Sequence, residues 1–163
     1  MKRLVVMMSV CGILMCGCSN GRMQKSNEGQ NDMNTEQLDV KGTRATETSE
    51  LYGTWAILTA NGMDAQDGMN KATVRFGRDG RMTGNTSINN YFGSYELTDG
   101  NLKCNMEGIT MMAGPKMEIE SAVKQALSEA HSIIINGDKA AVYDADDNLV
   151  MTLERTDSDV SEE

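Results

Sequence analysis

The segment from Leu51 to Arg155 has short runs of alternating hydrophobic and polar positions, which are typical of β-strands. Ala72, Val74 and Phe76 alternate with polar residues in one such run. Asp79-Gly80 follows it as a hairpin signal, because glycine tolerates the positive φ that a tight turn requires. Runs of this kind recur along the segment and predict about seven short strands.

Only one segment of the chain has helical periodicity. Its apolar positions recur at i, i+4, i+7, i+8 and i+11, namely at Ile119, Val123, Ala126, Leu127 and Ala130. Pro115 suits the first helical position and Gly114 the N-cap, so we predict that the helix begins there. One helix among short strands indicates an α+β fold that is mostly β, with an antiparallel barrel-like rolled sheet.

The N-terminus has the pattern of a secretory signal, with Lys2 and Arg3 before an apolar run that ends at Met15. Gly17 then precedes Cys18, which resembles the lipobox of bacterial lipoproteins. We predict a signal peptide at residues 1–17 and a lipid on Cys18. The alternatives are an ordinary signal peptide with incidental cysteines, or an uncleaved anchor.

Residues 19–50 are polar and follow neither the helical nor the strand period. Such a segment cannot bury enough surface to offset its ordering entropy. We therefore predict that residues 18–50 are the lipidated cysteine and a disordered tether. The folded domain is expected at residues 51–155, and an acidic tail at residues 156–163.

The chain of 163 residues has a formal net charge of −9. This charge argues against a nucleic-acid partner and against electrostatic binding to anionic lipid. The expected membrane contact is therefore the N-terminal lipid alone. We expect an outer membrane lipoprotein of the cell envelope, on the periplasmic face because Ser19 follows the lipidated cysteine.

Two ordered motifs resemble the META domain family, which includes the HslJ-like envelope proteins. Residues 84–95 read G-N-T-S-I-N-N-Y-F-G-S-Y, and residues 110–115 read T-M-M-A-G-P, followed by M-E-I-E at 117–120. Trp55 near the start and the segment 144–155 near the end also resemble the family. The resemblance implies a compact β-rich fold, an envelope location and links to stress, drug tolerance and virulence. No catalytic activity is implied.

Both cysteines of the family pattern are absent, because Ile88 and Gly114 take their places. If the family pair forms a bridge, the two replacements make sense together. We therefore expect Ile88 and Gly114 to face each other. Cys104 is the one cysteine outside the leader and the lipidation position, so it cannot form an intramolecular disulfide.

The candidate binding residues are those that match the family motifs. Asparagine amides in a tight bend can contact a ligand, or they can bond the backbone and stabilise the turn. The tyrosines can form a binding platform or belong to the core. The candidates are Asn89, Asn90, Tyr91, Gly93, Tyr95, Thr110, Met112, Glu118 and Glu120.

Other candidate chemistry is weaker. His131, the single histidine, has no motif around a candidate serine, and Cys104 on an inward strand face suits a core position. Residues 144–148 resemble the start of a calcium loop, but Leu149 stands at the glycine position and Arg155 at the glutamate position. We expect no catalytic residue, no metal site and no cofactor.

Ten of the 14 methionines lie outside the leader, and Met106, Met111, Met112 and Met117 are close in sequence. Thioethers can hold Cu(I), although core filling is the simpler interpretation. The sequence favours a non-enzymatic envelope lipoprotein that acts as a binding or accessory module in stress or drug tolerance, with an envelope protein or a small ligand as its partner. The alternatives are an inhibitor or partner of an envelope enzyme, and a soft-metal binder.

Overall fold

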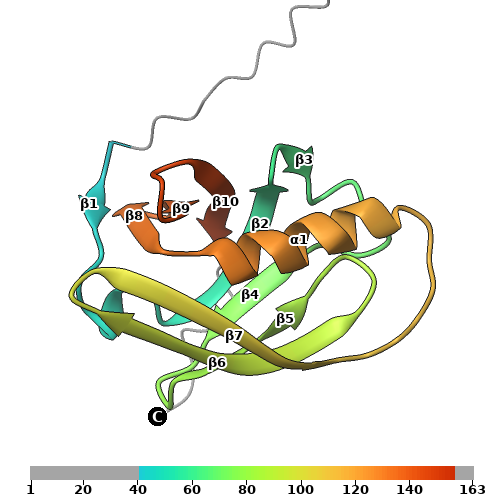
Figure 1. Ribbon diagram of the computed structural model, residues 1–163, viewed down its shortest axis with the longest axis horizontal. Helices are drawn as coiled ribbons and strands as arrows, with labels where there is room; N and C mark the ends of the chain where they lie inside the picture. The colour runs from blue at the N-terminus through green and yellow to red at the C-terminus, as the bar shows by residue number, and fades with distance from the viewer. Residues whose placement is uncertain (1–40, 157–163) are drawn as a thin grey trace, which may run out of the picture. The chain divides into compact units, whose positions relative to one another are not determined.

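The alternating runs form one antiparallel sheet that curls into a half-barrel (Figure 1). The computed structural model describes residues 41–156. The strand order is β1-β8-β9-β10-β2-β4-β5-β6-β7, and β3 pairs with β2. The strands are β1 (Thr43–Arg44), β2 (Gly53–Ala60), β3 (Met63–Asp64), β4 (Thr73–Phe76), β5 (Arg81–Asn85), β6 (Asn90–Thr98), β7 (Asn101–Ile109), β8 (Ser132–Asn136), β9 (Lys139–Tyr143) and β10 (Leu149–Arg155).

The mostly-β fold with one helix is confirmed, but ten strands replace the expected seven. Part of the excess comes from β1 and β3, which have two residues each. A pair of residues is too short to show alternation, so the sequence pattern cannot reveal such strands. The hairpins follow their turn signals, since both residues of Asn61-Gly62 and of Asp99-Gly100 have positive φ.

Helix α1 (Met117–Glu129) begins two residues later than predicted. Lys116 has a φ of 59° and is the N-cap, so Pro115 lies outside the helix instead of at its first position. The left-handed backbone at Lys116 ends any helical path from Pro115. No helix among residues 41–156 is long and apolar enough to cross a membrane.

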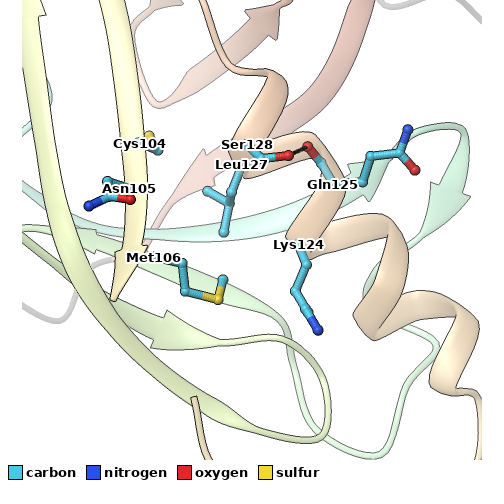
Figure 2. A pocket seen from close by; sticks show the side chains of 7 residues that line it. All are labelled: Cys104, Asn105, Met106, Lys124, Gln125, Leu127 and Ser128. Atoms are coloured by element: carbon cyan, nitrogen blue, oxygen red, sulfur yellow. Dashed lines mark hydrogen bonds between the residues drawn. The ribbon is translucent and has the colours of Figure 1, made fainter. Parts of the chain in front are cut away.

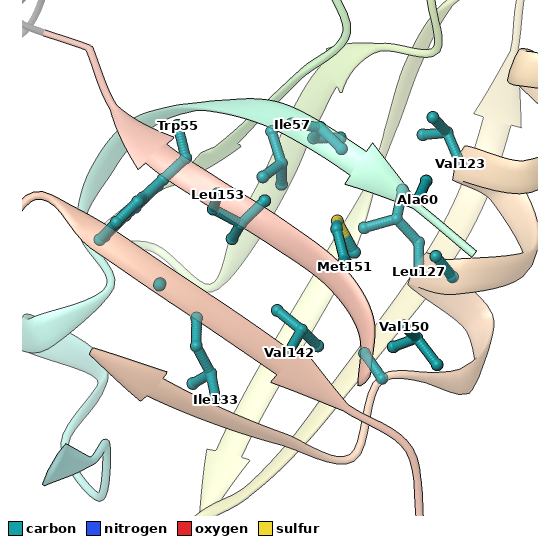
Figure 3. Close-up of a cluster of buried hydrophobic side chains, with 14 of the residues drawn as sticks. Trp55, Ile57, Ala60, Val123, Leu127, Ile133, Val142, Val150, Met151 and Leu153 are labelled. Carbon is teal, nitrogen blue, oxygen red and sulfur yellow. The ribbon is translucent and has the colours of Figure 1, made fainter. Parts of the chain in front are cut away.

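The core lies between the concave face of the sheet and α1. The apolar face of the helix packs against β2, β3, β7 and β10. Figure 3 shows Val123 and Leu127 of α1 pointing toward the side chains of β2 and β10. Trp55, Ile57 and Leu153 are fully or almost fully buried in the same cluster.

Residues 43–50 belong to the fold, so the tether prediction is wrong for them. Strand β1 pairs with β8, where Thr43 lies opposite Ile135. Ala45 is fully buried, and its N–H donates to the Ile133 carbonyl at 2.9 Å. A 3-10 helix, Thr48–Glu50, follows. The segment contributes backbone pairing and one small apolar side chain, which a hydrophobicity pattern does not reveal.

The remaining N-terminal predictions fall outside the described residues. They are the signal peptide at 1–17, the lipid on Cys18 and the tether up to residue 40. The acidic tail from residue 157 onward also lies outside them.

The first and last motifs of the domain meet at Trp55 and Arg155, which are paired across β2 and β10. The guanidinium carbon of Arg155 lies 4.1 Å from the centre of the Trp55 ring, within the range of a cation–π contact. Arg155 Nη1 donates to the Tyr52 carbonyl at 2.6 Å and Nη2 to the Glu50 carbonyl at 3.0 Å. Arg155 therefore joins the last strand to the N-terminal segment.

Candidate functional site

Three loop segments, 66–70, 85–90 and 110–116, converge beside the start of α1, and we call this region the loop junction. The Asn70 N–H donates to the Ser87 carbonyl at 2.8 Å. Lys116 Nζ lies 2.6 Å from Asp67 Oδ2 and donates to the Asp67 carbonyl at 2.7 Å. The loop junction brings both sequence motifs to one place.

Ile88 and Gly114 face each other in the loop junction, as expected. A Cβ placed on Gly114 would lie 3.2 Å from Cγ2 of Ile88, and Ile88 is almost fully buried. The Ile88 side chain therefore occupies the space beside the glycine. A larger residue at position 114 would press against it.

Asn89 is the centre of the loop junction, and its side chain is 2% exposed. Its Nδ2 donates to Glu120 Oε2 at 2.7 Å and to the Met112 carbonyl at 3.0 Å. Its Oδ1 accepts from Thr110 Oγ1 and from the Met112 N–H, both at 2.8 Å. All four hydrogen-bonding positions of the amide are therefore occupied by the protein itself.

Glu120 reaches the same network from α1 and is 6% exposed. Its Oε2 accepts a second hydrogen bond from Thr86 Oγ1 at 3.2 Å. The first turn of α1 also favours a negative charge, because the unpaired backbone N–H groups there form the positive end of the helix dipole. The buried carboxylate is thus stabilised by donors, and it lies too far inside the domain to meet a solvent ligand.

Backbone groups supply part of the hydrogen bonds that Asn90, Thr110 and Met112 make in the loop junction. Asn90 is exposed, and its N–H donates to Thr110 Oγ1 at 3.1 Å while its carbonyl accepts from the Thr110 N–H at 3.0 Å. The exposed Met112 contributes its backbone N–H and carbonyl to Asn89. Glu118 is exposed on the first turn of α1, apart from the network of Glu120.

Tyr91 and Tyr95 of β6 belong to the core. The Tyr91 hydroxyl donates to the Thr73 carbonyl at 3.0 Å, and the Tyr95 hydroxyl donates to the Gly77 carbonyl at 2.7 Å. Burial raises the pKa of Tyr91 well above its usual value, and that of Tyr95 to about 12. Gly93 lies between them, where a Cβ would overlap the Asn105 carbonyl oxygen. All three residues serve packing.

Ser87 is a buried residue that the sequence analysis did not single out. Its φ is 88°, its side chain is fully buried, and its Oγ has no hydrogen-bond partner. Among the described residues, Asn61 Nδ2 is the other buried side-chain atom in this state. The Ser87 side chain packs directly against Gly68. The run of small residues around Ser87 signals a bend but does not reveal this close approach.

A groove of about 670 Å³ lies between β7 and α1, and we call it the β7–α1 groove. Figure 2 shows Leu127 of the helix reaching toward the strand side, where Met106 lies, with Lys124 farther along the same helix. The lining combines apolar and polar side chains in similar numbers and carries a single charge, that of Lys124. The lining residues are Cys104, Asn105, Met106, Lys124, Gln125, Leu127 and Ser128.

Cys104 lines this groove and packs against the core as a partly buried residue. Burial raises the pKa of its thiol to about 12, so the sulfur is protonated at neutral pH. A nucleophilic cysteine needs the opposite shift, because the thiolate is the reactive form. Cys104 is therefore suited to packing.

The remaining candidates, the segment 144–148 and the neighbouring methionines, form no binding site among the described residues. Asp144 Oδ1 accepts from the N–H groups of Asp146 and Asn148, and hydrogen bonds from Asn148 lower the pKa of Asp144. Residues 41–156 contain no group of three histidine, cysteine or acidic side chains that could hold a metal ion. Of the four neighbouring methionines, Met106 lines the groove, while Met111, Met112 and Met117 are exposed on the loop and helix start.

The sequence of residues 46–157 matches the model of the META domain family. This match covers more than half of the chain and includes the loop junction, the β7–α1 groove and the Trp55–Arg155 contact. The chain belongs to the META domain family. A search of curated proteins finds no match.

Two solved structures share the META domain fold of this chain. A protein from Burkholderia xenovorans, solved by NMR, is 20% identical, with a TM-score of 0.54, and the match covers 84% of this chain and 99% of that chain. A DUF4847 family protein from Bacteroides vulgatus, solved by crystallography, is 14% identical, with a TM-score of 0.51, and covers 67% of this chain and 96% of that chain. At these identities the likeness shows the fold alone.

Proposed function

We propose that this META domain is a non-enzymatic binding module of the bacterial cell envelope, and that its ligands enter the β7–α1 groove. The groove is the observation that carries the proposal. Its volume of about 670 Å³ lies within the range of small-molecule sites. Its walls combine apolar contacts from Met106 and Leu127 with hydrogen-bonding groups and one positive charge from Lys124.

The loop junction supports the non-enzymatic part of the proposal. General acid–base chemistry needs groups that can reach a substrate and exchange a proton with it. The Asn89 amide makes all its hydrogen bonds within the protein. The Glu120 carboxylate is buried and accepts hydrogen bonds from Asn89 and Thr86. The motif residues thus hold the loops and the helix in place.

The proposed location is the periplasmic side of the outer membrane, with the domain held there by a lipid on Cys18. The support is the Gly17-Cys18 pattern after a short apolar run. Mass spectrometry of the mature N-terminus tests it: a diacylglyceryl cysteine at position 18 is expected. A mature chain that starts at another residue, or an unmodified Cys18, overturns the anchor.

The proposed partner is an envelope protein, and its role is accessory, in stress or drug tolerance. An inhibitor of an envelope enzyme is a special case, in which the partner is that enzyme. The mixed lining of the groove fits a protein partner, because non-obligate protein interfaces are about as apolar as the rest of a protein surface. Trp55, Tyr91 and Tyr95, which could have lined a deep aromatic pocket, are buried in the core.

Crosslinking in living cells tests the binding site. A photo-reactive residue replaces Ser128, which lines the groove, and in a matched variant replaces Ser121, which is exposed on α1 outside the groove lining. We expect the same protein adduct from repeated preparations at position 128 and none at position 121. Equal labelling at both positions, or none at either, contradicts the proposal.

A further inference from the structure

Strand β7 has an open edge on the side of the groove. Along an antiparallel ladder, alternate residues direct both backbone groups toward the partner strand or away from it. The Leu102 N–H donates to the His131 carbonyl at 2.7 Å, so Leu102 directs its backbone away from β6. Cys104 and Met106 follow at the same spacing of two.

The backbone hydrogen bonds of β6 lead to the same assignment for Cys104. Tyr95 lies opposite Cys104, and its N–H donates to the Gly80 carbonyl at 2.9 Å, on the side away from β7. Tyr95 and Cys104 are therefore a pair that exchanges no backbone hydrogen bonds. Gly93 and Met106 are a pair of the same kind, because the bulge in β7, where Glu107 has no partner in β6, begins only beyond them. The N–H and C=O groups of Cys104 and Met106 thus point toward the groove.

No described strand covers these groups. Within residues 41–156 the sheet order ends at β7, and Leu102 is the last residue of this edge whose outward N–H has a backbone partner. Exposed strand edges are usually covered, bent or charged, because they can pair with another chain. Here α1 forms the opposite wall of the groove and leaves space beside the edge.

The chemistry of the walls indicates which chain fits. Lys124 is the single charged residue of the lining, in a protein whose net charge is −9. The positive charge of Lys124 favours a carboxylate of the bound segment at this place. Gln125 and Ser128 offer further hydrogen-bonding groups along the helix wall, and Met106 and Leu127 offer adaptable apolar contact.

We propose that an extended acidic segment of a partner protein adds to β7 as a further strand. Its backbone pairs with the outward groups of Cys104 and Met106, and one of its carboxylates faces Lys124. Strand addition of this kind takes its affinity from backbone hydrogen bonds and its specificity from alternate side chains. The inference rests on the proposed binding function of the β7–α1 groove and adds the class of partner.

The test uses a peptide of eight residues, with valine and glutamate alternating and both ends blocked, and a counterpart with lysine in place of glutamate. The mature chain, labelled with ¹⁵N, is followed by NMR as each peptide is added. We expect the amides of Cys104 and Met106 to exchange at least tenfold more slowly in the presence of the glutamate peptide. The lysine peptide should bind at least fivefold more weakly.

Two variants and a control separate the contributions. Met106→Pro removes an outward N–H and leaves the ladder to β6 intact, so it should abolish binding. Lys124→Glu should reverse the preference between the two peptides without disturbing the fold. Lys71→Glu makes the same change of net charge at an exposed residue outside the groove and should leave both affinities unchanged.

Contrary results are distinguishable. If crosslinking at position 128 captures a partner but the amides of Cys104 and Met106 show no added protection, the groove binds and strand addition is wrong. If crosslinking also fails, the proposed function is wrong. A concentration-dependent dimer with protection at both amides before any peptide is added would identify a second copy of this chain as the occupant and overturn the acidic partner.

Discussion

The loop junction lies at the start of α1 and the β7–α1 groove lies beside its second half, yet the two sites use polar groups in opposite ways. In the loop junction, Asn89 and Glu120 are buried and bonded to one another and to neighbouring segments. In the groove, Gln125 and Ser128 are exposed, and their hydrogen bonds stay within the helix. The loop junction is internally complete, whereas the groove leaves groups available.

This difference teaches where to look for function in the domain. The family-motif residues of segments 85–90 and 110–116 gather in the loop junction, where they connect chain segments, and Tyr91, Tyr95 and Trp55 pack in the core. The residues of the groove belong to no motif. A motif in this fold therefore marks what holds the domain together, and the surface that can recognise a partner has to be found from the structure.

The largest effect is expected from Asn89→Asp. The change removes two donors and places a carboxylate where the amide nitrogen now lies 2.7 Å from Glu120 Oε2. Breaking a buried charged network typically costs about 3–5 kcal/mol. Urea unfolding at pH 7 should show a loss of this size.

Asn90→Asp is the matched control for that change. Asn90 is exposed, and its Oδ1 accepts a hydrogen bond from Asn85 Nδ2 at 2.8 Å, which aspartate can also accept. Its effect should stay within about 0.5 kcal/mol. Equal losses for the two variants would show that the Asn89 network is not what stabilises the loop junction.

A disulfide across the loop junction should have the next largest effect. The double variant Ile88→Cys with Gly114→Cys joins two positions whose side chains meet in space. Closing a loop of this size stabilises by about 3 kcal/mol. Unfolding of the oxidised and reduced forms should differ by that amount, whereas each single variant should show no difference. Failure to oxidise in air would mean that the two backbones cannot approach to bonding distance.

Removal of residues 41–50 should destabilise the domain by about 2–3 kcal/mol. A chain that starts at Leu51 lacks β1, the buried Ala45 and the Glu50 carbonyl that accepts from Arg155. For a domain of this size the melting temperature should fall by about 10 °C. The comparison is a chain that starts at Lys41. Equal melting temperatures would show that the segment adds nothing to the fold.

The smallest effect on stability is expected in the groove. Gln125→Ala and Ser128→Ala remove exposed side chains that bond within α1. Thermal unfolding should change by less than about 0.5 kcal/mol for either variant. Binding of the glutamate peptide should nevertheless weaken measurably. A large loss of stability would mean that the groove is structural, like the loop junction.

Much of the fold could be predicted from the sequence, because its signals are local. Alternation at Ala72, Val74 and Phe76 reports a half-buried strand, and Asp99-Gly100 reports a tight turn, wherever the segment lies in the domain. The buried face of α1 follows from its own periodicity. The mutual approach of Ile88 and Gly114 could be expected from the family resemblance alone.

The sequence by itself thus determined the strands with clear alternation, the hairpin turns, the helix and the family. Only the tertiary structure decided the inclusion of residues 43–50, the late start of α1 at Met117 and the complete bonding of the Asn89 amide. It also decided that the backbone of Cys104 and Met106 faces a groove. The physical reason is the distance along the chain over which each feature is decided. Periodicity reports the conformation of neighbouring residues. The hydrogen bond from Asn89 to Glu120 and the open edge of β7 depend on where distant segments meet.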